Sequence, residues 1–342
     1  MNILRRYSIP TSSGKIFKPT LAALALALPV LLVIYLSVGS ADASVFRAIG
    51  DLFRGDHSSP DFKIVFLLRL PRALGALVAG AALSTSGIII QAVLNNPMAA
   101  PNIIGVNAGA GLAAVICMAL APTLIAILPL AAFAGALATT LLIFAVSRAV
   151  GAGRVTVTLV GIAIGSMLAA LINAAKIFFP DAVYDIVGFQ VGSLSSVGYL
   201  KVLPAAAVVI IAASLALILS RSLDIISLGD EVAMGLGMRV TRVKLLLLVI
   251  ASALAGAAVS FAGLIGFVGL IAPHIFRRLV GGIHQRLIPV GILGGAVLVL
   301  LSDLIAKTVA SPYELPVGII LSLAGGPFFI YLILRAGKER VK

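Results

Sequence analysis

Residues 245–279 read LLLLVIASALAGAAVSFAGLIGFVGLIAPHIFRRL, and this apolar run decides how the chain divides into helices. As one α-helix the run would be about 52 Å long, because each residue adds 1.5 Å. The hydrocarbon core of a bilayer is only about 30 Å thick. The whole run is therefore too long for one membrane crossing. Gly263 and Gly266 are the natural place for a turn, so we expect one membrane span on each side of them.

The same reasoning, applied to every apolar run, predicts ten membrane crossings. The composition agrees, because 61% of the 342 residues are hydrophobic and only 11% are charged, whereas a soluble domain is about a quarter charged. We therefore expect an all-α, polytopic integral membrane protein that forms a single domain over residues 1–342. The expected crossings are residues 20–39, 70–93, 99–119, 122–147, 155–178, 200–219, 243–262, 264–281, 287–307 and 316–335.

Part of the run at 245–279 has a counterpart earlier in the chain. Residues 79–87, AGAALSTSG, align without gaps on residues 255–263, AGAAVSFAG. The same register also pairs Pro97 with Pro273 and Gly105 with Gly281. An odd number of predicted crossings separates the two copies, so they would point in opposite directions, as in transporters built from inverted repeats. We expect repeat halves over roughly residues 66–178 and 243–335.

The formal net charge of +13 is an orientation signal. In a soluble chain such a charge would suggest nucleic acid, but these cations are scattered in ones and twos between apolar runs, so no nucleic-acid partner is expected. Most of the 25 Lys and Arg residues fall in the termini and in alternate loops between the predicted spans. The positive-inside rule then predicts that both termini are cytoplasmic.

The chain shows no chemistry that would drive transport by itself. Secondary transporters usually carry ionisable groups near the bilayer midplane, but Lys176, Asp303 and Lys307 fall near the outer ends of their predicted spans. The single cysteine and three histidines are too scattered for a metal site or a disulfide. A nucleotide-binding P-loop sequence is also missing. We therefore expect a non-catalytic chain without a cofactor, driven by another subunit.

One segment between the sixth and seventh predicted spans suggests where such a subunit attaches. Residues 227–237, SLGDEVAMGLG, read as a capped, short amphipathic helix between glycines on the cytoplasmic face. Met234 and Leu236 would need a surface to bury against. Burial against a partner and burial among lipid headgroups both remain open on these grounds.

Several motifs occur in order along the chain, among them RLPR at 69–72, NPMAAP at 96–101, GVNAGA at 105–110, GFVGLIAPH at 266–274 and ELPVGI at 314–319. With these motifs the chain resembles the membrane subunit of ABC importers for iron-siderophore, haem and cobalamin, the FecCD type. The resemblance covers nearly the whole chain after Val45. It implies a second permease copy or a paralogue, two ATPase subunits that bind ATP and Mg, an extracytoplasmic binding protein, and a place in the cytoplasmic membrane.

The resemblance also implies roles for individual residues. The loop at 221–242 would couple to the ATPase, and the cations at the outer rim would meet acidic residues of the binding protein, although cations there can also reach lipid phosphates. The path would lie between two copies, with spans five and ten as walls. The residues are Ser227, Leu228, Gly229, Asp230, Glu231, Ala233, Leu236 and Gly237 for coupling, Arg69, Arg72 and Lys307 for docking, and Asn96, Pro97, Met98, Arg154, Thr156, Gly161 and Gly165 for the inner gate and path.

Three points stay open. The substrate is expected to be a ferric siderophore, with cobalamin and haem as alternatives. The competing class is a secondary transporter that needs no ATP. For Gly161 and Gly165, gating and plain tight packing between helices fit the sequence equally well.

Overall fold

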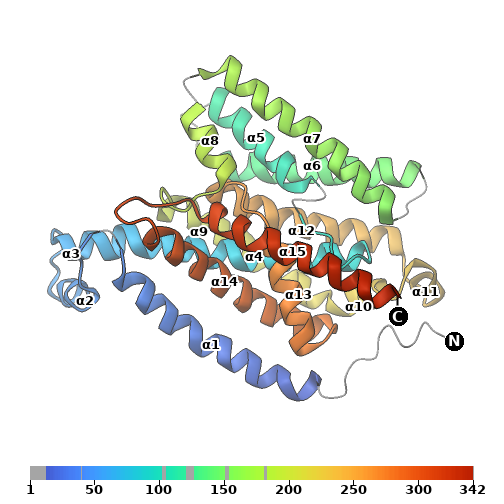
Figure 1. Ribbon diagram of the computed structural model, residues 1–342, viewed down its shortest axis with the longest axis horizontal. Helices are drawn as coiled ribbons and strands as arrows, with labels where there is room; N and C mark the ends of the chain where they lie inside the picture. Colours follow the sequence, from blue (N-terminus) through green and yellow to red (C-terminus); the bar gives the residue numbers. More distant parts are fainter. Residues whose placement is uncertain are drawn as a thin grey trace.

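The computed structural model describes residues 13–39, 41–101, 105–120, 127–150, 154–180 and 183–341. All regular elements within these ranges are helices (Figure 1), which confirms the predicted all-α fold. They are α1 (Ser13–Ser37), α2 (Val45–Arg54), α3 (Pro60–Phe62), the π-helical η2 (Lys63–Arg69), α4 (Leu70–Val93), α5 (Val106–Leu120), α6 (Leu128–Ala149), α7 (Arg154–Phe178), α8 (Val183–Val191), α9 (Tyr199–Ile218), α10 (Ser220–Ile226), α11 (Asp230–Gly235), α12 (Val240–Ala262), α13 (Val268–Val280), α14 (His284–Thr308) and α15 (Val317–Val341).

Eight helices in the described part of the chain are long and apolar enough to cross a membrane. They match eight of the ten expected crossings. The crossing expected at 70–93 begins earlier, because α3, η2 and α4 form one continuous helix over Pro60–Val93.

The crossings expected at 99–119 and 264–281 have much shorter helices. Helix α5 has 15 residues and α13 has 13, so they are only about 23 and 20 Å long. Their predicted lengths were wrong because each expected crossing begins with non-helical backbone. Before α13 the chain turns through Gly263 and Phe267, which have φ angles of 71° and 64°.

The two halves pack against each other reciprocally. Helix α4 packs on α14, and its counterpart α12 packs on α6. In the same way, α5 contacts α12 and α13 contacts α4. An exchange of this kind is what a repeat with two-fold symmetry produces.

The predicted gap-free register does not extend beyond the first helix of each half. Gly263 ends α12, and a Cβ there would lie 2.3 Å from the carbonyl oxygen of Phe189. Its counterpart Gly87 lies inside α4, where it contacts Gly269. Beyond this point Pro97 lies in a turn, whereas Pro273 lies inside α13. The predicted alignment of these prolines was therefore wrong.

Glycines bring α4 and α14 into backbone contact. A Cβ on Gly80 would lie 2.1 Å from the Gly295 carbonyl oxygen, and a Cβ on Gly295 would lie 2.3 Å from the Gly80 carbonyl oxygen. Only residues without a side chain allow this approach. The contact holds the first half against the second at the centre of the helix bundle.

The bundle has two distinct ends (Figure 1). Helices α10 and α11, the start of α1 and the end of α15 lie at one end, and α2 and α3 lie at the other. The predicted coupling loop and the predicted outer cations thus lie at opposite ends of the bundle. We call these the inner end and the outer end, in keeping with the predicted orientation.

Candidate coupling segment, outer ion cluster and transport path

The coupling segment at the inner end consists of α10, α11 and the turn between them. Gly229 and Gly237 flank α11 with φ angles of 111° and 80°, so the predicted short helix between glycines is confirmed. The predicted side-chain cap was wrong. Gly229 itself is the N-cap residue of α11, and the Ser227 hydroxyl donates to the carbonyl oxygen of Leu223 in α10 instead.

The outer surface of the coupling segment is apolar. Ala233 is fully buried, but four larger side chains around it are about half exposed or more: Leu228 (57%), Val232 (48%), Met234 (57%) and Leu236 (64%). Asp230 and Glu231 lie in the first turn of α11. The Asp230 carboxylate pairs with Lys244 of α12 at 2.7 Å. This surface, which we call the coupling face, has apolar side chains beside an acidic edge.

Two contacts connect the coupling segment to the rest of the bundle. The Asn95 side chain donates from Nδ2 to the carbonyl oxygen of Ile226 at 3.0 Å. The backbone N–H of His284, at the start of α14, donates to Asp224 at 2.9 Å, and the His284 ring lies 2.7 Å from the same oxygen. A displacement of α10 would thus reach both the loop after α4 and the start of α14.

The predicted inner-gate residues fall in two places. Asn96, Pro97 and Met98 lie in the turn after α4, where the side-chain Oδ1 of Asn96 accepts from the Met98 backbone N–H at 3.0 Å. This turn directly follows Asn95 and is therefore joined to the coupling segment. Arg154 begins α7 and Thr156 is half-buried, but the Arg154 side chain lies outside the described residues.

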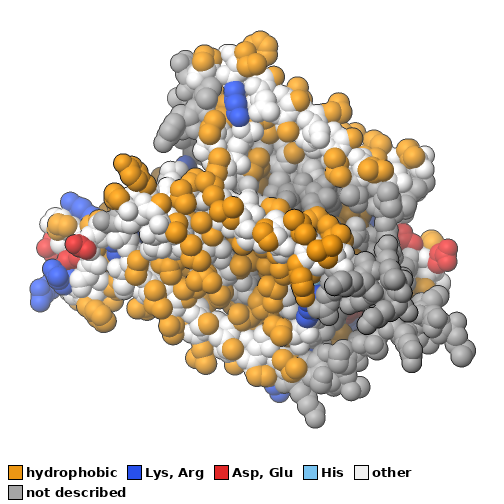
Figure 2. Space-filling model, viewed as in Figure 1, with side chains coloured by type: hydrophobic (Ala, Val, Ile, Leu, Met, Phe, Trp, Pro, Cys, Tyr) orange, Lys and Arg blue, Asp and Glu red, His pale blue; other side chains and the backbone are white. Residues whose placement is uncertain are grey.

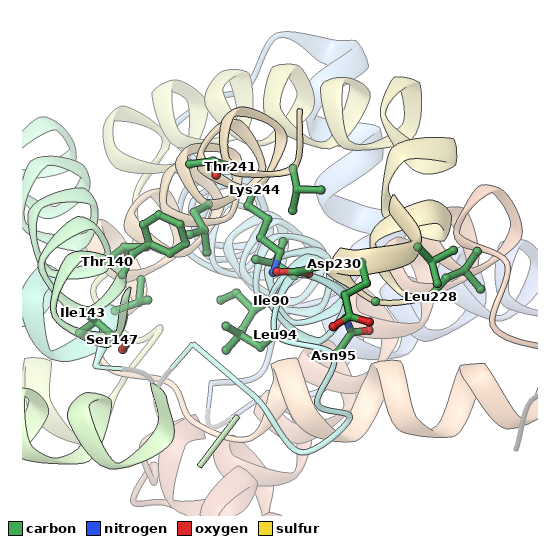
Figure 3. Close-up of a pocket in the computed structure, with 18 residues that line it drawn as sticks. Ile90, Leu94, Asn95, Thr140, Ile143, Ser147, Leu228, Asp230, Thr241 and Lys244 are labelled. Carbon is green, nitrogen blue, oxygen red and sulfur yellow. The ribbon is translucent and has the colours of Figure 1, made fainter. Parts of the chain in front are cut away.

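A cavity of about 520 Å³ separates α11 from α4 and α6 (Figure 3). Ile90, Leu94 and Ile143 supply an apolar wall, while Asp230 and Lys244 supply a charged rim. Ser147 also lines the cavity, and its buried hydroxyl has no hydrogen-bond partner. The cavity leaves α11 loosely supported on its inward side.

An ion cluster at the outer end joins α1, α4 and α14. The Arg72 guanidinium donates to both Asp303 carboxylate oxygens, at 2.8 and 3.1 Å. Asp303 is fully buried and also accepts from the Tyr35 hydroxyl at 2.5 Å. Arg72 makes a further ion pair with Glu314 in the loop before α15. Arg72 is therefore held by two carboxylates of its own chain.

The other two predicted docking cations belong to the same cluster. The Lys307 ammonium donates to the Tyr35 carbonyl oxygen at 2.6 Å and lies 3.5 Å from the centre of the Tyr35 ring. Arg69 donates to the carbonyl oxygens of Leu36, at 2.7 Å, and Ala41. Only 3% of Lys307 and 8% of Arg69 are exposed. The prediction that these two cations stand on the outer rim was wrong, because α1 covers them.

Helices α7 and α15, the expected walls of the path, leave apolar side chains uncovered (Figure 2). Leu159, Ile162 and Met167 are exposed on α7, and Leu323 and Ile330 are exposed on α15. In Figure 1, α7 lies on the opposite side of the bundle from α1. Both helices have room for a further contact.

Gly161 and Gly165 have a packing role in this structure. A Cβ on Gly105, which precedes α5, would lie 3.2 Å from the Gly161 carbonyl oxygen and 3.5 Å from the Gly165 nitrogen. The two glycines of α7 therefore let the start of α5 approach closely. This contact fits the packing role, and the gating role stays a prediction.

Sequence reasoning missed a second cavity, of about 590 Å³, near the outer end. It lies between α5, α8 and the end of α12, and α8 was not among the expected helices. Hydroxyl, aromatic and charged groups share its lining: Ser193, Ser195, Ser196, Ser260, Phe189, Phe261, Lys201 and Glu314. We call it the outer cavity. In the residues searched, no group of three or more His, Cys, Asp or Glu side chains could hold a metal ion.

Comparison with known proteins identifies the family. The model of the FecCD transport family matches residues 27–335. The chain belongs to the FecCD transport family. Its relatives include the Fe(3+)-citrate import system permease protein YfmD of Bacillus subtilis, 37% identical over 87% of this chain and 89% of that protein. The hemin transport system permease protein HmuU of Yersinia pestis is 35% identical over 91% of this chain and 95% of that protein.

Further comparisons extend this result. The iron(3+)-hydroxamate import system permease protein FhuB of Bacillus subtilis is 38% identical over 88% of this chain and 79% of that protein. A solved metal-chelate type ABC transporter in an inward-facing conformation has a TM-score of 0.80 and 28% identity, and covers 93% of this chain and 99% of that one. This FecCD protein is therefore an ABC importer permease located in a membrane.

Proposed function

We propose that this FecCD permease moves a ferric siderophore inward across the cytoplasmic membrane. The observation that carries the substrate class is the similarity to permeases of iron(3+)-citrate and iron(3+)-hydroxamate systems over most of their lengths. In such ligands the iron is wrapped in a polar chelate, which hydroxyl groups and a few charges can contact. The outer cavity offers these groups near the end at which substrate would enter.

The energy would come from ATP hydrolysed in a separate subunit that docks on the coupling face. Exposed apolar side chains beside charges are the usual composition of a protein interface. The contacts from Asn95 to Ile226 and from His284 to Asp224 would pass a push on α11 to the bundle. The cavity behind α11 would give that helix room to move.

The path would lie between this chain and a second copy or a paralogue. The uncovered apolar faces of α7 and α15 support this arrangement, since they could pack against the same faces of a partner. An extracytoplasmic binding protein would deliver substrate at the outer end. The predicted docking cation Arg72 and its partner Glu314 are partly exposed there, with 11% and 31% of their side chains accessible.

Reconstitution tests the proposed function. The permease would be placed in liposomes with its candidate ATPase and binding protein, and uptake of labelled ferric hydroxamate, ferric citrate, haemin and cobalamin would be compared. We expect uptake of a ferric siderophore that needs both ATP and the binding protein. Uptake or exchange by the permease alone would instead establish a secondary transporter.

Haem is the second candidate substrate, because the similarity to the hemin permease HmuU extends over 91% of this chain. The same experiment distinguishes the two. ATP-dependent uptake of haemin without uptake of either ferric siderophore would assign haem and contradict the siderophore proposal.

A further inference from the structure

Helix α2, at the outer end, has three different faces. Phe46, Ile49 and Phe53 follow one another at spacings of three and four residues and therefore share one side of the helix. Phe46 is 85% exposed and Phe53 is 86% exposed. Arg47 and Arg54 lie along the neighbouring side, and Ala48, on the remaining side, is fully buried. The apolar side is thus turned away from the protein.

Local contacts hold α2 in this orientation. The Ser44 hydroxyl caps its start by accepting from the Arg47 backbone N–H, and the Ser44 N–H donates to Asp61 at 2.7 Å. At its end Gly55 takes a left-handed conformation and donates back to the last turn. The Ser59 hydroxyl also donates to Asp51 at 2.6 Å. Because both ends are fixed, the exposure of the two phenylalanines is a property of the fold.

The apolar face of α2 lies beside exposed apolar side chains of the spanning helices α1 and η2. Helix α2 contacts α1 and η2. On α1, Val30 and Val33 are exposed, and on η2, Leu67 and Leu68 are exposed. In a membrane protein such side chains of spanning helices meet acyl chains. In Figure 1, α2 lies on the same side of the bundle as α1 and far from α7, one of the two helices with faces suited to a second permease copy.

We propose that α2 is an interfacial anchor that lies in the plane of the outer leaflet. Phe46, Ile49 and Phe53 insert at the boundary between headgroups and acyl chains, as the apolar faces of short amphipathic helices do. Arg47, whose side chain is 78% exposed, and Arg54 lie at the level of the lipid phosphates. Through Ser44 and Asp61, the anchor sets the height at which the long helix Pro60–Val93 begins.

The chain contains no tryptophan, so one introduced tryptophan reports on one position. The variants Phe46→Trp and Phe53→Trp would be reconstituted separately into vesicles of phosphatidylcholine brominated near the headgroup end of its acyl chains. We expect blue-shifted emission and loss of about half the fluorescence or more, because an interfacial residue lies about 5–10 Å into the boundary region. Vesicles of the unbrominated lipid give the reference intensity.

Two further variants serve as the positive and the negative control. Val33→Trp, on the exposed side of α1 near its outer end, should also be quenched, whereas His57→Trp, in the exposed polar turn after α2, should keep emission close to that in water. The same water-like, unquenched emission at positions 46, 53 and 57 would overturn the proposal. Emission at 46 and 53 that shifts only when a binding protein is added would also overturn it, and would assign the face to protein contact.

Discussion

The two ends of this permease differ in how their predicted docking residues are exposed. At the outer end, α1 covers Arg69 and Lys307, and Arg72 is paired with two carboxylates of its own chain. At the inner end, the coupling face leaves apolar side chains such as Met234 and Leu236 at the surface. Both ends were predicted from sequence as docking surfaces. The predicted docking cations of the outer end are paired within the chain, whereas the apolar side chains of the coupling face are exposed.

The outer and inner ends should also differ in local stability. A buried ion pair with all its partners costs much free energy to open, so the outer end should resist rearrangement. The coupling face lies over a cavity and is connected by a few hydrogen bonds, and regions with few buried contacts open most easily. The movable element of the transporter should therefore be at the inner end.

Charge reversal at the outer end should have the largest effect. Arg69→Glu with Arg72→Glu places a new carboxylate against the buried Asp303, so we expect a loss of about 3–5 kcal/mol of stability. Thermal unfolding of the purified protein in detergent measures it. Arg47→Glu, at an exposed cation of the same end, is the matched control. A normally stable double variant that fails only in uptake would restore the docking role of these arginines.

Backbone contact between the halves should give the next effect. Gly80→Ala adds a methyl group where only 2.1 Å separates it from the Gly295 carbonyl oxygen, and overpacking of this kind costs about 1–3 kcal/mol. Gly235→Ala in α11, where a Cβ meets nothing within 4 Å, is the control and should be neutral. Equal unfolding temperatures for the two variants would contradict the close packing of α4 on α14.

Substitution of the coupling face should affect transport without affecting stability. Met234→Ser with Leu236→Ser removes apolar contact area for the ATPase, and we expect ATP-driven uptake to fall about tenfold, which corresponds to about 1.4 kcal/mol. Tyr313→Ser, at an exposed side chain of the outer end, is the control. If both variants transport normally, the coupling face does not dock the ATPase.

The smallest effect should come from the ion pair at the edge of the coupling face. Asp230→Asn breaks the contact with Lys244, but half of the Asp230 side chain is exposed, and surface pairs contribute at most about 1 kcal/mol. Thermal unfolding should therefore barely change. A loss as large as that of the outer charge reversal would show that the coupling segment is as tightly fixed as the outer end.

Much of the fold could be predicted because the signals are local. Hydropathy located the eight long spans, and the shared pattern of α4 and α12 predicted a repeat. The lengths of α5 and α13 could not be predicted, because both follow turns whose conformations depend on the packing around Gly105 and Gly263. Helices α2 and α8 were missed because ten and nine residues give no spanning signal.

Among the candidate sites, one could be predicted from local sequence, whereas two are formed by segments far apart in the chain. The short helix of the coupling segment was predicted from its own residues, since glycines and an acidic first turn mark it, whereas its coupling role rests on the family resemblance. The outer ion cluster was not predicted, because Tyr35 and Asp303 are 268 residues apart and no spacing relates them. The outer cavity also joins distant segments, from α5 to the loop before α15.

The amino-acid sequence by itself determined that this protein is a helical membrane permease of its family and where most of its spans lie, and it predicted a short helix outside the spans as a docking segment. These properties follow from hydropathy and short motifs, which neighbouring residues carry. Only the tertiary structure decided which charges remain available, because a cation is free or satisfied according to the distant groups that folding brings to it. Arg69 and Lys307 lost their predicted exposure for that reason, and α2 gained an exposed apolar face.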